Sequence, residues 1–267
     1  MKNSRRPVAV FDSGLGGLTV FKAISRRMPG EDLLYFGDTA HIPYGTKSRE
    51  AVTRYSLHIA RFLESLGIKA LVVACNTASA LALPEIQKSV KVPVVGVIHP
   101  GARAAADATR SGRVGVIGTE ATIASGAYAE ALKEYLPGVR TVSAACPLFV
   151  PLVEEGWWAH PVTARVAKEY LAPMRKSPID TLILGCTHYP LLKRPIQGAL
   201  GPSVKLIDSA EQTAIETEEL LESLKLRARG GPGSRAFFVS DAPKRFLKLA
   251  KRLLGVSVSK VSLHQFD

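Results

Sequence analysis

Cysteine is scarce in this chain, with three residues among 267: Cys75, Cys146 and Cys186. The odd number excludes a complete set of disulfide pairs, and no two cysteines form the Cys-x-x-Cys spacing of redox disulfides. A zinc site built from Cys75, Cys186 and His188 matches no strong ligand spacing. We therefore expect free, reduced thiols and a cytoplasmic protein.

Long apolar runs are also missing. No run approaches the roughly 18 residues that a membrane-spanning helix needs. The apolar stretch at residues 8–11 ends at Asp12, which is too short for the apolar region of a signal peptide. We expect neither a membrane anchor nor an export signal.

Acidic residues are few relative to basic ones, 23 against 35, which gives a formal charge of +12. Residues 223–267 hold ten Lys and Arg against two Asp, a net charge of +8. This basic section is either a solvated helix face or a surface that attracts anions, such as nucleic acid or a dicarboxylate substrate. Charge alone does not decide between these alternatives.

The rest of the composition is that of an ordinary globular protein, with 46% hydrophobic and 22% charged residues. Short apolar strands alternate with amphipathic helices along the chain, which predicts an α/β fold of doubly wound, mostly parallel sheets. The expected elements include one helix over residues 119–136 and a last strand near residues 256–263.

Two of the predicted strands end in a cysteine followed by small polar residues. One is followed by Ala74-Cys75-Asn76-Thr77 and the other by Gly185-Cys186-Thr187-His188. Ligands of open α/β sheets bind outside the carboxyl ends of the strands. We predict two similar lobes that face one cleft: lobe A, residues 1–98 plus 208–267, carries Cys75, and lobe B, residues 99–207, carries Cys186.

The paired thiols suggest acid/base chemistry. Both precede helices, whose N-termini lower the pKa of a thiol, and the usual thiol pKa of about 8.5 lies near working pH. Two thiols on opposite sides of a carbon can remove a proton from one face and return one to the other. This inverts a stereocentre without a cofactor. His188 can orient Cys186 or exchange protons with it, and we interpret Cys146 as a buried structural cysteine.

A glycine-rich segment, Asp12-Ser13-Gly14-Leu15-Gly16-Gly17-Leu18-Thr19, follows the first strand. Its backbone amides can approach an anion at a helix N-terminus. Thr19 stands where a dinucleotide fingerprint has its third glycine, so we favour a carboxylate site or a tight turn. Asp12 is a site residue or a helix N-cap. The Pro43-Tyr44-Gly45 turn either presents polar groups to a ligand or simply connects strand and helix.

These segments resemble the signature segments of the glutamate racemases, in the aspartate/glutamate racemase superfamily. The resemblance runs from Val8 to about Glu216 and continues more weakly to Leu254. It implies a cofactor-independent isomerase whose two lobes close over glutamate. D-glutamate would then supply peptidoglycan synthesis, and with it cell-wall growth and cell shape.

The resemblance also implies roles for single residues. Cys75 and Cys186 correspond to the acid/base thiols, the first acting on the D face of the substrate and the second on the L face. Asp12 and His188 correspond to assisting residues, and a further glutamate corresponds to Glu154 or the adjacent Glu155, of which we favour Glu154. The residues that match substrate contacts are Asp12, Ser13, Tyr44, Gly45, Asn76, Thr77, Thr187 and His188.

We therefore expect glutamate as the small-molecule partner, no cofactor, no metal and no membrane, and we leave a homodimer open. Aspartate racemase, which also pairs two cysteines, is the nearest alternative. A related decarboxylase uses one such thiol. A basic, non-catalytic nucleic-acid-binding protein is the alternative of another class, and it would show salt-sensitive DNA binding.

Overall fold

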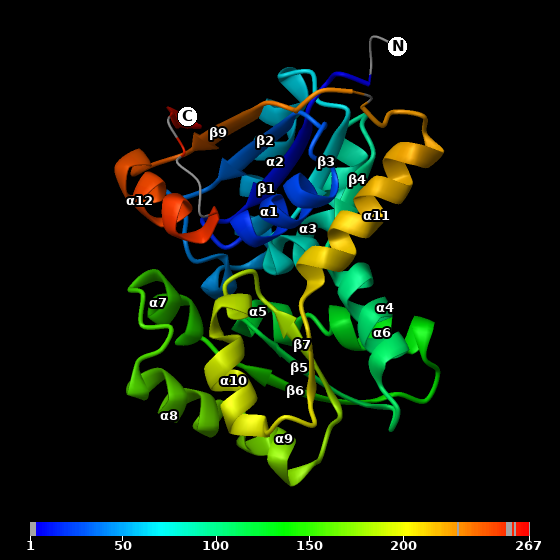
Figure 1. Ribbon diagram of the computed structural model, residues 1–267, viewed down its shortest axis with the longest axis vertical. Helices are drawn as coiled ribbons and strands as arrows, with labels where there is room; N and C mark the ends of the chain where they lie inside the picture. The colour runs from blue at the N-terminus through cyan, green and yellow to red at the C-terminus, as the bar shows by residue number, and fades with distance from the viewer. Residues whose placement is uncertain (1–3, 229, 255–257, 259, 267) are drawn as a thin grey trace.

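The chain forms two α/β lobes, each built on its own parallel sheet (Figure 1). The structure is a computed structural model that describes residues 4–228, 230–254, 258 and 260–266. Every strand pairing in both sheets is parallel. This confirms the predicted fold class.

The larger sheet has the strand order β10-β9-β2-β1-β3-β4. Its strands are β1 (Val8–Asp12), β2 (Leu33–Gly37), β3 (Ala70–Val73), β4 (Val94–Gly96), β9 (Arg235–Val239) and β10 (Ser262–Leu263). Part of the last predicted strand, residues 256, 257 and 259, lies outside the described residues. The strand that the structure assigns there, β10, is shorter than the prediction.

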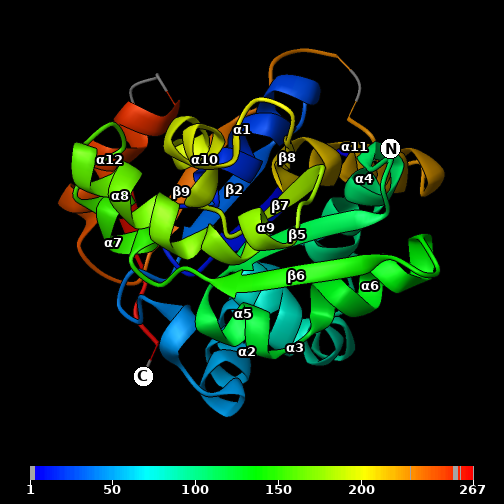
Figure 2. The same cartoon turned by 90° about the horizontal axis from the view of Figure 1, so that it is seen from below.

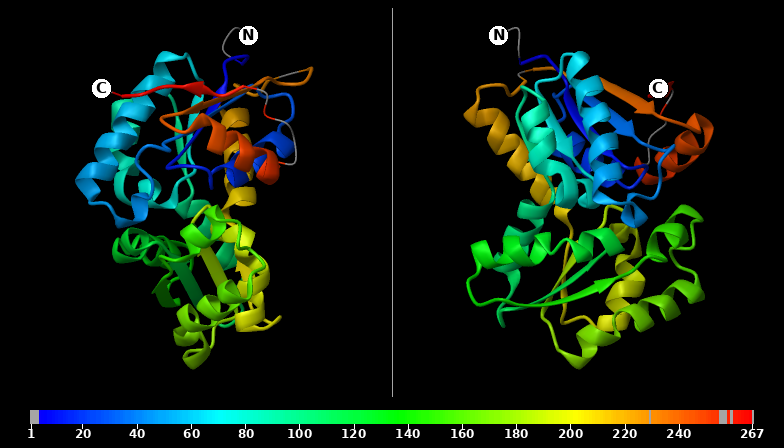
Figure 3. Two further views of the ribbon diagram at one scale, coloured as in Figure 1. Left: turned by 90° about the vertical axis from the view of Figure 1, so that its left-hand side faces the viewer. Right: turned by 180° about the vertical axis from the view of Figure 1, so that it is seen from behind.

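Helices cover both faces of this sheet (Figure 3). Alternate residues of β1 point to opposite faces, as the pleat of a strand requires. Val8 and Val10 join the core beneath α1 (Leu18–Arg27), α11 (Ser209–Ser223) and α12 (Pro243–Leu254). Ala9 and Phe11 join the core beneath α2 (Arg49–Ser65) and α3 (Asn76–Ser89). Burial on both sides explains why these strands are apolar throughout.

The smaller sheet has the strand order β6-β5-β7-β8 and is seen from below in Figure 2. Its strands are β5 (Arg113–Gly118), β6 (Arg140–Ala145), β7 (Thr181–Gly185) and β8 (Lys205–Ile207). Residues of α4 (Ile98–Ala108) and α6 (Ala127–Tyr135) share one core with the sheet. The opposite core includes residues of α7 (Phe149–Glu154), α8 (Pro161–Tyr170), α9 (Ala172–Lys176) and α10 (Lys193–Leu200).

The single helix predicted over residues 119–136 is wrong. The structure has two helices there, α5 (Glu120–Ala124) and α6. Gly126 lies between them with a φ of 70°, in the left-handed region, which side-chain-bearing residues avoid and which a continuous helix cannot contain. The Ser125 hydroxyl accepts a hydrogen bond from the amide of Ala127, the first residue of the second helix.

The chain crosses between the lobes on one side of the molecule, at α4 and α11 (Figures 1 and 3). These helices contact each other, and α11 also packs against α1 of the larger lobe. Asp208 caps α11 by accepting a hydrogen bond from the amide of Ala210 at 3.0 Å. The predicted boundaries at 98/99 and 207/208 fall where these helices begin, and the division into lobes A and B at those residues stays a prediction.

A buried ion pair gives a test of the lobe A core. The side chains of Lys69 and Glu31 are 1% and 0% exposed. Lys69→Met should leave the carboxylate of Glu31 buried with Arg227, 3.5 Å away, as its remaining cation. Breaking a buried pair costs about 3–5 kcal/mol of folding stability. Because Arg227 still partly compensates the charge of Glu31, we expect a loss at the lower end, about 3 kcal/mol. The midpoint of urea unfolding, followed by circular dichroism, measures it.

The matched control is Arg27→Met, which removes a pair with Glu218 whose arginine is 41% exposed. Exposed pairs contribute about 0–1 kcal/mol, so this variant should unfold close to the wild type. Equal losses in the two variants would show that the buried pair has no special weight.

Candidate active site

Both predicted thiols line one narrow cavity between the lobes, at the carboxyl ends of the strands. Cys75 follows β3 of the larger sheet and Cys186 follows β7 of the smaller one. The cavity measures about 20 Å³, which is room for about one water molecule. It is lined by Ser13, Gly14, Ile42, Pro43, Tyr44, Gly45, Cys75, Asn76, Thr77, Thr119, Val150, Cys186, Thr187 and His188.

Cys75 is buried at the N-terminus of α3, where its sulfur accepts a hydrogen bond from the amide of Ala78 at 3.5 Å. Burial, and then the nearby charge of Asp12, raise its pKa to about 12. The hydrogen bonds from Ser13 and Ala78 oppose this shift but do not cancel it. The predicted lowering of this pKa by the helix N-terminus is therefore outweighed, and Cys75 is a protonated thiol at neutral pH.

Cys186 faces a histidine from the same loop. Its sulfur lies 3.8 Å from Nδ1 of His188, and both residues are buried. Burial alone would lower the pKa of His188, but contacts with Cys186 and Glu154, together with the charge of Asp12, raise it to about 10. His188 is therefore an imidazolium at neutral pH, with its charge against the sulfur of Cys186.

Glu154, at the end of α7, lies on the far side of His188. Its Oε1 is 3.4 Å from Nε2 of His188, close enough for an ion pair although the two atoms are not aligned as a hydrogen bond. Burial would raise the pKa of Glu154, but His188 and Arg245 together lower it. Neither glutamate lines the cavity, but Glu154 faces His188, whereas Glu155 is 70% exposed and lies near Arg245 instead. The geometry therefore favours Glu154 as the predicted glutamate.

Asp12 lies behind the cavity wall rather than on it. It is fully buried at the end of β1 and accepts hydrogen bonds from the amide of Gly14 at 2.9 Å and from the hydroxyl of Thr187 at 3.3 Å. Burial raises its pKa above the usual value. Asp12 thus links lobe A to lobe B and places a carboxylate near His188. It is not among the residues that line the closed cavity, and its predicted contact with substrate stays a prediction.

Asn76 and Thr77 contact side chains of lobe B that the sequence motifs did not predict. Oδ1 of Asn76 accepts a hydrogen bond from the Tyr128 hydroxyl at 2.6 Å. The Thr77 hydroxyl lies 3.0 Å from that of Thr119 and 3.1 Å from that of Thr122. Thr119 follows strand β5 as the cysteines follow their strands, and this position in the sequence could have predicted that it belongs to the site. The contacts of Tyr128 and Thr122 had no signal in the sequence.

The side-chain amide of Asn76, on the cavity wall, is only half satisfied. Nδ2 of Asn76 is buried and makes no hydrogen bond among the described residues. An unsatisfied buried donor is unfavourable by about 1–3 kcal/mol. Since Asn76 lines the cavity, this amide is a donor available to an acceptor such as a carboxylate.

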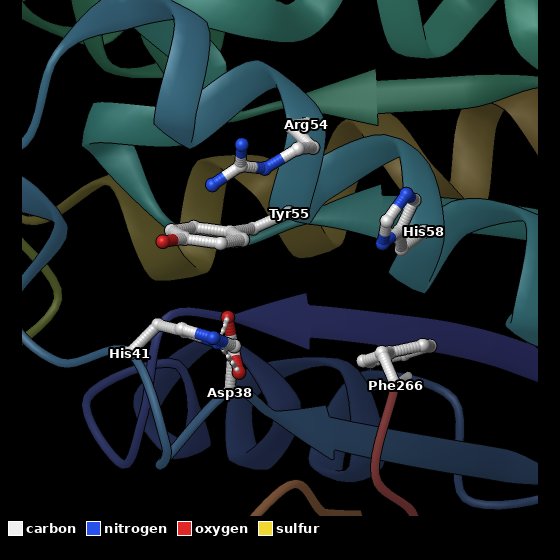
Figure 4. A pocket seen from close by; sticks show the side chains of 6 residues that line it. All are labelled: Asp38, His41, Arg54, Tyr55, His58 and Phe266. Atoms are coloured by element: carbon white, nitrogen blue, oxygen red, sulfur yellow. Dashed lines mark hydrogen bonds and ion pairs between the residues drawn. The ribbon is translucent and has the colours of Figure 1, made fainter.

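Tyr44 lines the cavity while its hydroxyl is turned to a neighbouring site. It donates a hydrogen bond to Oδ2 of Asp38 at 2.6 Å. Asp38 also borders a separate cavity of about 320 Å³ (Figure 4), lined by Asp38, His41, Arg54, Tyr55, His58 and Phe266. That cavity is larger but contains neither thiol, so the predicted chemistry belongs to the narrow one.

A family model described as Asp/Glu/Hydantoin racemase matches residues 16–217. The glutamate racemase of Geobacter metallireducens is 56% identical to this chain over 96% of its length and 95% of the relative. The chain belongs to the glutamate racemases of this family. This confirms the resemblance predicted from the signature segments, and with it the class of isomerase.

Solved glutamate racemases share the whole fold. The enzyme from Francisella tularensis, in complex with D-glutamate, has 39% identity and a TM-score of 0.93 over 99% of both chains. The enzyme from Thermus thermophilus, in complex with beta-chloro-D-alanine, has 47% identity and a TM-score of 0.90 over 99% of this chain and 98% of that one. In the part of the chain that the structure describes, no helix is both long and apolar enough to cross a membrane.

Gly16 tests how closely the lobes meet at the site. A Cβ atom at Gly16 would lie 2.2 Å from Oγ1 of Thr187 and 2.6 Å from Nδ1 of His188. Gly16→Ala should therefore hold the lobes apart and expose both thiols. We expect Cys75 and Cys186 to react about tenfold faster with a thiol reagent such as iodoacetamide, which corresponds to about 1.4 kcal/mol in favour of open forms.

The control is Gly198→Ala, within α10, where an added Cβ meets no atom within 4 Å. Its thiols should react at the wild-type rate. Unchanged thiol reactivity in Gly16→Ala would mean that the lobes are not held together at this point.

Proposed function

We propose that this chain interconverts L- and D-glutamate by moving the α-proton between two thiols. The observation that carries the proposal is that one cavity receives Cys75 from one lobe and Cys186 from the other. The relative from F. tularensis binds D-glutamate, which supports glutamate as the substrate.

The charges around the thiols suggest how the cycle begins. With L-glutamate, Cys186 as a thiolate removes the α-proton from one face, and the Cys75 thiol donates its proton to the other face. The products are D-glutamate, a Cys75 thiolate and a Cys186 thiol, and the reverse reaction uses the same groups with their roles exchanged. The protonated state of Cys75 and the imidazolium of His188 beside Cys186 suit this direction.

Donors at the cavity suit the two carboxylates of the substrate. The unsatisfied Nδ2 of Asn76 and the backbone amides at the start of α3 are available on its wall. The hydroxyls of Ser13 and Thr187 also line it and are hydrogen-bonded to Cys75 and Asp12 while the cavity is closed. Helix N-termini and neutral donors bind carboxylates without a metal. We assign Ser13, Tyr44, Gly45, Asn76, Thr77 and Thr187 to substrate binding, and Asp12, His188 and Glu154 to assisting the thiols.

Substrate entry requires the lobes to separate. A cavity of about 20 Å³ holds about one water molecule, not an amino acid. Because the chain crosses between the lobes at α4 and α11, a hinge at these helices would let the lobes separate on the opposite side of the molecule and so widen the cavity. Closing again would exclude water from the thiols during proton transfer.

The proposal extends to the setting of the enzyme. We place it in the cytoplasm, since all three cysteines are unpaired, as in a reducing compartment. Its D-glutamate would supply peptidoglycan synthesis, as the resemblance implies. A homodimer, and activity without any cofactor, stay predictions.

The direct test is incubation with L-glutamate in deuterated water, with optical rotation and α-carbon exchange followed together. Loss of rotation with deuterium entering at the α-carbon supports the proposal. Inversion and exchange with aspartate but not with glutamate would keep the mechanism and change the substrate. Neither reaction with either amino acid would contradict the proposal.

The two thiols should be separately indispensable. Cys75→Ala and Cys186→Ala should each lower racemisation by at least about 10²–10⁴-fold, the usual effect of losing a general acid or base. Chiral chromatography measures the rate in both directions, and circular dichroism checks the fold. Cys146→Ala is the control, because Cys146 packs in the core of lobe B and does not line the cavity. Near-normal turnover in either thiol variant would refute the mechanism.

Glu154→Gln should lower kcat by about tenfold, which is roughly 1.4 kcal/mol of activation free energy, because it removes the negative charge that faces His188. Glu154 helps to raise the pKa of His188. Without that charge His188 loses its proton at lower pH, so the alkaline limb of the pH–kcat profile should move to lower pH. Glu155→Gln, at an exposed position, is the control and should change neither property. The opposite pattern would assign the role to Glu155.

A further inference from the structure

Arg245, in the basic C-terminal section, reaches across the cleft from lobe A to lobe B. It lies in the first turn of α12, and its Nη2 is 3.4 Å from Oε2 of Glu154 and 3.9 Å from Oε1 of Glu155. In Figure 1, α12 of the upper lobe and α7 of the lower lobe lie on the same side of the molecule, away from α4 and α11, where the chain crosses between the lobes. The contact therefore spans the side on which the lobes would separate.

The same helix packs over the outer side of the Glu154–His188 pair. Leu249 of α12, Trp158 of lobe B and Gly16 border a residual space of about 10 Å³ together with Glu154 and His188. A space this small leaves room for no more than one water. Packing by α12 thus covers this side of Glu154, whose side chain is 13% exposed.

The two oxygens of Glu154 face different cations. Oε1 faces Nε2 of His188, and Oε2 faces Arg245. Glu155 contributes the neighbouring negative charge, while His188 faces Cys186 and the charge of Asp12 on its other sides. The two cations hold the carboxylate of Glu154 in one orientation, and both favour its ionised form.

We propose that Arg245 is a positioning residue for the racemisation: from lobe A it holds Oε2 of Glu154, so that Oε1 faces His188 when the lobes are closed. Arg245 does not line the thiol cavity and acts through Glu154 and His188 on Cys186. Because it belongs to the other lobe, this arrangement is completed only on closure. The inference rests on the proposed function.

The test is Arg245→Gln, assayed for kcat, KM and the pH dependence of kcat with L-glutamate. Exposed pairs are weak, and Arg245 is 58% exposed, so we expect kcat to fall about two- to fivefold. KM should change less than about twofold, because Arg245 does not reach the cavity. Arg245 helps to lower the pKa of Glu154, so without it the acid limb of the pH–kcat profile should move to higher pH.

Two further variants separate position from charge. Lys244→Gln removes the same charge from the adjacent exposed residue and should leave kcat and the acid limb unchanged. Arg245→Lys keeps a cation, so its kcat should lie between those of Arg245→Gln and the wild type, and the acid limb of its pH–kcat profile should stay close to the wild-type position. Equal behaviour of Arg245→Gln and Lys244→Gln, or a change in KM alone, would overturn the inference. An inactive wild type would instead refute the proposed function.

Discussion

The close contact between the glycine-rich loop of lobe A and the Thr187-His188 segment of lobe B is the constraint on which the site depends. Gly16 lies so near these side chains that even a methyl group would overlap them. Beside it, Asp12 accepts a hydrogen bond from Thr187. Because these two segments lie so close together, one small cavity is bordered by the ends of β1 and β3 from the larger sheet and of β7 from the smaller sheet.

Burial then changes the pKa values of the ionisable side chains around this cavity. Asp12, His188 and Glu154 are largely withdrawn from water and alternate in sign. In a medium of low dielectric, each charge depends on its neighbours, because an unpaired buried ion is unfavourable. The result is an asymmetric pair of thiols, with a raised pKa at Cys75 and a histidine cation at Cys186. Perturbed groups of this kind cluster at functional sites.

The basic C-terminal section looked, as a sequence, like a solvated face or a surface for anions. In the structure Phe246 and Ala250 of α12 are buried in the core of lobe A, while Arg245 of the same helix meets Glu154. A local count of charges cannot distinguish these uses, because the acidic partner is 91 residues away in the sequence. Only the packing of α12 beside α7 brings the two together.

The sequence by itself determined the strand–helix alternation, the parallel sheets and the position of both cysteines at strand ends. These follow from short-range patterns of apolar and small residues, which constrain the backbone within a few positions. Tertiary structure decided the partners of Asn76 and Thr77, which are Tyr128 and Thr122, and the direction of the pKa shift at Cys75. Burial and contacts between lobes control these features. Both depend on residues distant in the chain, so no local pattern of residues records them.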